Sequence, residues 1–180
     1  MQESTSAAAS GQDAWGVHQT VMAAQAAQAL ITRAQGVYVD ATFGRGGHTR
    51  ELLARLGPQA RVFGLDRDPQ AAQAAAALTD ARFRFVQAPF SQLTAVLADW
   101  QVSAVDGVLL DLGISSPQID QPHRGFSLRA AGPLDMRMDP SAGLSLGQWL
   151  AQASVGELAE VIREYGEERF ARQVAEAIVA

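Results

Sequence analysis

One stretch constrains the fold more than any other part of the chain. In Tyr38-Val-Asp-Ala-Thr-Phe-Gly-Arg-Gly-Gly-His48, a β-branched and aromatic run ends in a glycine-rich turn, and an alanine- and leucine-rich segment follows. This pattern predicts a strand that leads through a loop into a helix. Gly44, Gly46 and Gly47 let the backbone turn tightly and approach a ligand, while the N–H groups at the helix start face the same crevice. The turn therefore predicts a loop that holds a nucleotide-like cofactor.

Two further acidic residues follow apolar runs. Asp66 ends the run that begins at Arg61, at the distance where such folds place a carboxylate for ribose hydroxyls. The run from Val105 to Gly113 is typical of a buried parallel strand, and it carries Asp111 at its carboxyl end. Since parallel strands end at the same edge of a sheet, three strand ends are expected to converge at one site.

The glycine spacing bears on which cofactor is bound. A nicotinamide fingerprint has the form G-x-G-x-x-G, but its last position is Thr49 here. An acid ahead of the G-x-G turn, here Asp40, is instead similar to motif I of S-adenosylmethionine-dependent methyltransferases. A nicotinamide-dependent oxidoreductase remains the alternative. Asp40 has two interpretations, as a brace of the glycine loop or as a direct cofactor contact.

The order of elements predicts the fold class. We expect strands at 37–43, 61–66, 83–88 and 105–111, and helices at 48–56, 69–78 and 91–100. Such alternation predicts an α/β fold with a doubly wound parallel sheet. A preceding helix begins near His18 and is closed by Gly36, with an apolar face that contains Val21, Met22, Leu30 and Ile31.

Composition and charge exclude several classes. The chain has 180 residues, 48% of them hydrophobic, which is enough for one core. It has no cysteine, which excludes disulfides and thiolate metal sites, and the histidines His18, His48 and His123 lack metal-ligand spacing, so no metal is expected. Without a basic leader or a long apolar run, we expect a cytoplasmic protein that does not enter a membrane. The net charge of -5 argues against simple electrostatic binding of nucleic acid, so an RNA substrate would be recognised by shape.

The ends of the chain differ from its middle. Residues 1–14 have almost nothing to bury and are predicted to be a disordered leader. A long loop is expected over 114–143, because it holds four of the seven prolines. Two helical segments follow, opened by capping boxes at Ser145 and Ser154. The last apolar pattern reaches Ala180 without a stop signal, which we interpret as truncation.

Five phrases together resemble one family. They are Asp40-Ala-Thr-Phe-Gly-Arg-Gly-Gly-His48, Asp111-Leu-Gly-Ile-Ser-Ser-Pro-Gln118, Arg124-Gly-Phe-Ser127, Gly132-Pro-Leu-Asp-Met-Arg-Met-Asp139 and Tyr165-Gly-Glu-Glu-Arg-Phe-Ala-Arg172. They are similar to the RsmH (MraW) family of bacterial 16S ribosomal RNA cytosine-N4 methyltransferases. The resemblance runs from His18 to Ala180.

The resemblance implies a Rossmann-like methyltransferase core over 15–125 and, over 126–180, the beginning of an inserted helical substrate-recognition domain. It implies S-adenosylmethionine as the cofactor and a cytidine in the decoding region of 16S ribosomal RNA, within the small ribosomal subunit, as the substrate. The family's cofactor positions fall on Gly46, Gly47, His48, Asp66, Phe90, Asp111 and Gln118. Without the family match, His48 would be interpreted as a local backbone partner.

The reaction itself suggests roles for two further features. A cytosine amine is a poor nucleophile, so the site must accept its hydrogen bonds and align it, and Asp111 is our candidate catalytic residue. Among three arginines in the long loop, Arg124 is predicted to contact RNA, while Arg129 and Arg137 are predicted to be solvated or paired with nearby acids. A non-catalytic fragment that binds cofactor or RNA without turnover is the third hypothesis.

Overall fold

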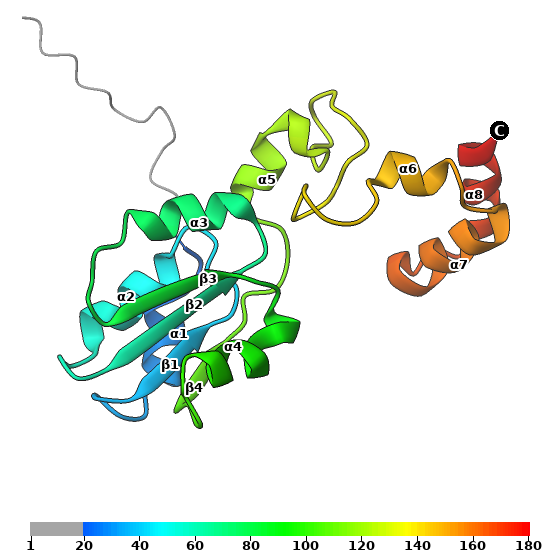
Figure 1. Ribbon diagram of the computed structural model, residues 1–180. Helices are drawn as coiled ribbons and strands as arrows, with labels where there is room; N and C mark the ends of the chain where they lie inside the picture. Colours follow the sequence, from blue (N-terminus) through cyan, green and yellow to red (C-terminus); the bar gives the residue numbers. More distant parts are fainter. Residues whose placement is uncertain (1–19) are drawn as a thin grey trace, which may run out of the picture.

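A computed structural model describes residues 20–180 of the chain as an α/β sheet followed by a helical arm (Figure 1). The strands are β1 Val37–Asp40, β2 Arg61–Asp66, β3 Phe83–Gln87 and β4 Gly107–Leu109. The helices are α1 Ala23–Leu30, α2 Gly47–Arg55, α3 Pro69–Ala76, η1 Phe90–Gln92, α4 Leu93–Asp99, α5 Ser116–Asp120, η2 Pro122–Arg124, α6 Leu146–Leu150, α7 Val155–Gly166 and α8 Ala171–Val179. The predicted leader over 1–14 lies outside the described residues.

The four strands form one parallel sheet in the order β3-β2-β1-β4. In its register, Val39 pairs with Phe63 of β2 and with Val108 of β4. β1 is therefore the central strand at which the chain changes direction across the sheet. This arrangement confirms the predicted doubly wound α/β fold, and it brings all strand carboxyl ends to one edge.

Helices cover both faces of the sheet because side chains alternate along each strand. On one face, Tyr38 and Val62 pack with Leu52 of α2 and Ala27 of α1. On the other face, Val39, Phe63 and Leu65 pack with Leu93, Val96, Leu97 and Trp100, which belong to α4 or flank it. Burial of both faces explains why these strands are nearly continuous apolar runs.

The first helix is shorter than predicted. Val21 and Met22 precede α1 and are 74% and 63% exposed, because Met22 adopts a left-handed conformation with φ 53° that cannot continue a helix. The helix ends at Leu30, well before Gly36, so Gly36 does not close it. A Cβ atom on Gly36 would lie 2.7 Å from the Asp106 carboxylate, so this glycine permits close packing instead. The predicted helix start at His18 lies outside the described residues.

The fourth strand is an edge strand, which corrects the prediction of a buried strand over 105–111. β4 spans three residues and pairs only with β1 among the residues described. Because no described strand covers its outer side, Val108 is 37% exposed and Leu110 is 50% exposed. Its carboxyl end still reaches the same edge as β1 and β2.

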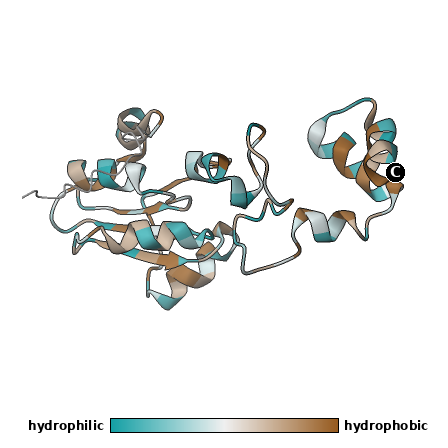
Figure 2. Cartoon of the chain, turned by 90° about the horizontal axis from the view of Figure 1, so that it is seen from above, coloured by the Kyte–Doolittle hydropathy of each residue, from teal (hydrophilic) through white to brown (hydrophobic). Residues whose placement is uncertain are grey.

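The region after β4 contains more structure than the long loop that the prolines predict. Its first part forms α5 and η2, which lie near α3, and the chain then leads to α6, α7 and α8 (Figure 1). The capping boxes at Ser145 and Ser154 are confirmed as the starts of α6 and α7. Figure 2 shows α6 to α8 as an arm that stands apart from the sheet and carries apolar residues. Helices α7 and α8 pack against each other, yet they leave Tyr165, Phe170 and Ile178 exposed.

Candidate functional site

A cavity of about 500 Å³ lies at the carboxyl edge of the sheet. One wall is the glycine turn after β1, a second is the segment after β2, and the third is the segment after β4. Six of the predicted cofactor residues line it: Gly47, His48, Asp66, Phe90, Asp111 and Gln118. Small-molecule sites have volumes of this order, roughly 300 to 1,000 Å³.

The glycine turn follows β1 directly, and its backbone path requires glycine at two positions. Gly44 and Gly46 have φ values of 55° and 75°, in the left-handed region that glycine adopts without steric cost. A Cβ atom on Gly46 would also lie 2.6 Å from the Phe43 ring, which is buried between Phe83 and Phe85. Gly46 does not line the cavity, but it sets the path of the turn that does.

Asp40 braces this turn. Its side chain is fully buried, its Oδ2 accepts a hydrogen bond of 2.8 Å from Thr49 Oγ1, and its Oδ1 accepts one of 3.3 Å from the Thr42 N–H. Burial raises the pKa of the Asp40 carboxyl, and the hydrogen bonds from Thr49 and Thr42 oppose that rise. Asp40 does not line the cavity, so the geometry supports the bracing interpretation over direct cofactor contact. Thr49 is thus a structural partner at the position where the nicotinamide fingerprint has glycine.

Asp66 lies on the second wall with its carboxylate held by the backbone. Its Oδ2 accepts a hydrogen bond of 2.8 Å from the Gly44 N–H, and its Oδ1 accepts one of 2.9 Å from the Asp68 N–H. A carboxylate has about four lone-pair sites, so two remain for a ligand. The side chain is therefore oriented before any hydroxyl group reaches it.

Asp111 and His48 lie next to each other in the lining of the cavity. The His48 Nε2 atom lies 3.4 Å from the Asp111 Oδ2 atom, with the histidine side chain 9% exposed and the aspartate side chain 63% exposed. The Asp111 N–H donates a hydrogen bond of 2.7 Å to Thr42 Oγ1. The His48 Nδ1 atom has no hydrogen-bond partner within residues 20–180, so His48 is not the local backbone partner that its position alone suggests. The pair presents an open carboxylate beside a buried imidazole.

Phe90 and Gln118 line the cavity in different ways. Phe90, in η1, is 50% exposed and offers an apolar ring surface. Gln118 is only 5% exposed, and both ends of its amide are engaged. Its Oε1 accepts from the Ser115 N–H at 2.8 Å, and its Nε2 donates to Asp68 Oδ2 at 2.7 Å. Its side chain therefore connects two walls of the cavity.

The position of Arg124 corrects the prediction that it contacts RNA. Its side chain is 4% exposed, and its Nη2 atom lies 2.9 Å from Asp68 Oδ2. A guanidinium that is buried in an ion pair cannot reach an RNA phosphate from this position. The prediction for Arg137 is confirmed, because Arg137 pairs with Asp135 at 2.6 Å. The hydrogen bond from the Arg137 side chain is the main reason why the pKa of Asp135 is lowered to about 2. Arg129 is exposed.

Sequence reasoning missed Asp68, the buried carboxylate that joins these contacts. A signal for it existed, since Asp68 precedes Pro69 and this is the pattern of an N-cap followed by proline in the first turn. Sequence reasoning also missed Arg45 and Arg67, two exposed cations that line the cavity. Their type was visible, but their position at the cavity was not.

Over residues 20–180, no group of three or more histidine, cysteine or acidic side chains is arranged to hold a metal ion. Within the same range, no helix has the length and apolar character needed to span a bilayer.

Comparison with known sequences agrees with this geometry. The sequence pattern of the MraW methylase family matches residues 16–180. Proteins named ribosomal RNA small subunit methyltransferase H from Burkholderia mallei and Burkholderia pseudomallei are each 59% identical over 163 residues, which cover 91% of this chain and 52% of the relative. The protein of that name from Burkholderia vietnamiensis is 58% identical over the same coverage. This chain thus spans about half the length of the curated relatives it matches. Since the family pattern covers nearly all of the sequence, and the predicted resemblance is confirmed, the chain belongs to the MraW methylase family.

Proposed function

We propose that this chain is the cofactor-binding part of an S-adenosylmethionine-dependent methyltransferase that acts on the N4 amine of a cytidine in 16S ribosomal RNA. The observation that carries the proposal is that Asp66, the glycine turn, Phe90 and Asp111 line the same cavity. Its relatives, named ribosomal RNA small subunit methyltransferase H, support the substrate class. In this proposal, residues 15–125 are the catalytic core, and residues 126–180 begin a helical substrate-recognition domain.

The residues present fit the cofactor. Asp66 has acceptor sites left for ribose hydroxyls after its two backbone hydrogen bonds. The half-exposed Phe90 ring offers a surface for the adenine base, and the backbone of the turn at Gly47 and His48 meets the methionine part. When bound, S-adenosylmethionine supplies a methyl group carried by a positively charged sulfur.

The protein's own contribution to the reaction is orientation and charge. The Asp111 carboxylate is open to the cavity, so it accepts a hydrogen bond from the target amine and adds negative potential beside the sulfonium. The amine loses a proton when its nitrogen forms the new bond. The Asp111 carboxylate, next to His48 Nε2, holds that proton in our proposal. Alignment of the amine carries most of the rate enhancement, because its lone pair is delocalised into the ring.

The chain has a net charge of -5, which does not attract RNA, so binding of RNA phosphates depends on individual exposed cations of the protein. Arg45 and Arg67 are exposed at the cavity, and we propose that they contact phosphate groups in place of the buried Arg124. Recognition of the small subunit would then depend on shape, with these two contacts at the site. The proposed location is the cytoplasm, where ribosomal RNA is found.

Two measurements test the function. Titration calorimetry with S-adenosylmethionine and with a nicotinamide dinucleotide should give binding of the first only. Methyl transfer to small ribosomal subunits should be mapped by mass spectrometry, with this chain and with the chain joined to the remaining half of its Burkholderia pseudomallei relative. Methylation at a cytidine N4 by the joined protein supports the proposal, and tighter binding of the dinucleotide would overturn it. Binding without turnover in both proteins would identify a non-catalytic fragment.

A further inference from the structure

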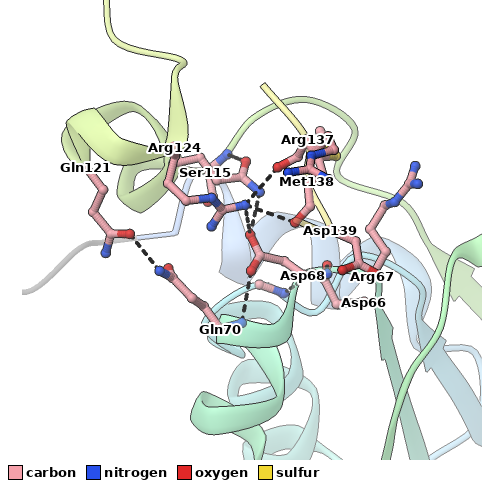
Figure 3. A network of polar contacts seen from close by, with 12 residues as sticks. Asp66, Arg67, Asp68, Gln70, Ser115, Gln121, Arg124, Arg137, Met138 and Asp139 are labelled. Carbon is pink, nitrogen blue, oxygen red and sulfur yellow. Dashed lines mark hydrogen bonds and ion pairs between the residues drawn. The ribbon is translucent and has the colours of Figure 1, made fainter. Parts of the chain in front are cut away.

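Asp68 is a buried carboxylate that collects hydrogen bonds from three parts of the chain (Figure 3). Its Oδ1 accepts from the Gln70 N–H at 2.9 Å and so caps α3. Its Oδ2 accepts from Gln118 Nε2 at 2.7 Å and from Arg124 Nη2 at 2.9 Å. Asp68, Gln118 and Arg124 are 6%, 5% and 4% exposed. The network therefore joins the start of α3 to α5 and η2 in a region that water does not screen.

The far side of this network holds the third wall of the cavity. Arg124 Nη2 also donates to the carbonyl oxygens of Arg137 at 3.1 Å and of Met138 at 2.9 Å. Gln118 Oε1 accepts from the Ser115 N–H. Since Ser115 and Met138 line the cavity, both pieces of this wall are held by side chains that Asp68 binds.

The near side of the network holds the carboxylate proposed for ribose. The Asp68 N–H donates to Asp66 Oδ1, so the same residue orients Asp66 through its backbone and the third wall through its side chain. A second bridge runs parallel to it, from Gln70 Nε2 to Gln121 Oε1 at 2.6 Å. Any displacement of α5 and η2 from α3 therefore changes the cavity on both sides.

A buried ion pair of this kind fixes the relative position of the segments that it joins more than it stabilises the folded protein. Desolvation of two charges offsets most of their attraction, whereas removal of one partner leaves an uncompensated buried charge. The Arg124 Nε atom is also buried and has no hydrogen-bond partner within residues 20–180. Since an apolar contact would pack at lower cost, the role of the pair lies in where it holds the two segments.

We propose that the ion pair of Asp68 and Arg124, with Gln118, is a positioning strut that keeps the third cavity wall in place and thereby sets the cofactor affinity. The inference rests on the proposed function, because the ligand is S-adenosylmethionine. Asp68 and Arg124 act through other residues and are not themselves catalytic. Asp68→Asn keeps a capping oxygen for the Gln70 N–H but removes the charge that Arg124 requires.

The test is titration calorimetry of the 180-residue chain with S-adenosylmethionine and with S-adenosylhomocysteine. We expect Asp68→Asn and Arg124→Met each to weaken binding roughly tenfold, as a coupling between segments of this kind does. The double variant should be little weaker than either single variant, because both remove the same interaction. Arg124→Lys keeps the charge and should recover most of the affinity. As a matched control, Asp80→Asn breaks another aspartate–arginine pair, with Arg82 at 2.6 Å, outside the cavity lining, and should bind normally.

A second measurement separates positioning from simple stability. Trypsin cleavage after the exposed Arg129 should be slowed by S-adenosylmethionine in the wild type but not in Asp68→Asn. If the pair had a purely structural role, Asp68→Asn would change the melting temperature and leave this protection intact. Wild-type affinity and protection in folded Asp68→Asn and Arg124→Met would overturn the inference and leave the proposed function standing. If Asp68→Asn does not fold, the two Arg124 variants decide. A wild-type chain that binds neither ligand would overturn the proposed function, and the inference with it.

Discussion

The hydrogen bond from Thr49 to Asp40 allows a sharp test of how the glycine turn is held. Both side chains are fully buried, and Thr49 Oγ1 donates to Asp40 Oδ2 at 2.8 Å. Thr49→Val keeps the shape but removes the only side-chain donor to this carboxylate among residues 20–180. Hydrogen bonds to charged groups contribute about 1.5 to 3 kcal/mol, so we expect a loss near 2 kcal/mol at neutral pH. For a chain of this size, that corresponds to a melting temperature lower by roughly 4 to 8 °C.

The destabilisation caused by Thr49→Val should depend on pH in a definite direction. Burial raises the pKa of Asp40 above its ordinary value of 3.8, so the contribution of this group to stability is most favourable below that value and is lost as pH rises through the folded pKa. Thr49→Val removes a hydrogen bond that opposes the rise. The destabilisation should therefore be larger near neutral pH than in mild acid, where the protonated carboxyl needs no donor.

The assay is thermal unfolding followed by far-ultraviolet circular dichroism, in both pH ranges. Thr49→Ser is the matched control, because it keeps the hydroxyl and loses one buried methyl group, at a cost of about 1 kcal/mol that does not depend on pH. Equal losses for Thr49→Val at both pH values, or wild-type stability at neutral pH, would refute the bracing role of Asp40.

Three further outcomes are expected. Asp66→Ala should weaken S-adenosylmethionine binding by about 1 to 3 kcal/mol in calorimetry, because a ribose acceptor is lost, and unchanged affinity would contradict the ribose assignment. Asp111→Asn should fold normally but lower single-turnover methyl transfer by the joined protein roughly a hundredfold, the scale of a lost preorganised contact, so a wild-type rate would move the chemistry elsewhere. Because Tyr165, Phe170 and Ile178 are exposed, the chain should bind a hydrophobic dye and self-associate. Tyr165→Ser and Phe170→Ser together should reduce both dye binding and association. A monomeric wild type with little dye binding would argue against an unpartnered face.

The fold was predictable where one signal dominated. Strands buried on both faces, such as Arg61–Asp66, form apolar runs, and the helices between them have their own period, so element order and fold class followed. The ends of helices and strands depended on tertiary contacts and local backbone conformation, which the hydrophobic periodicity of the sequence does not predict. The left-handed backbone of Met22 shortens α1. Within residues 20–180, β4 has no outer neighbour and only three paired residues.

The candidate site was predictable in the same uneven way. The sequence by itself determined that Asp66 and Asp111 would meet at one edge beside the glycine turn, because parallel strands point the same way and their carboxyl ends must coincide. Only the tertiary structure decided which charges stay open to a ligand. Asp68 and Arg124 lie 56 positions apart and became a buried pair through the packing of α5 and η2 near α3, whereas Asp111 stayed exposed beside His48. Whether a charged side chain is compensated depends on distances and burial, which the order of residues does not record.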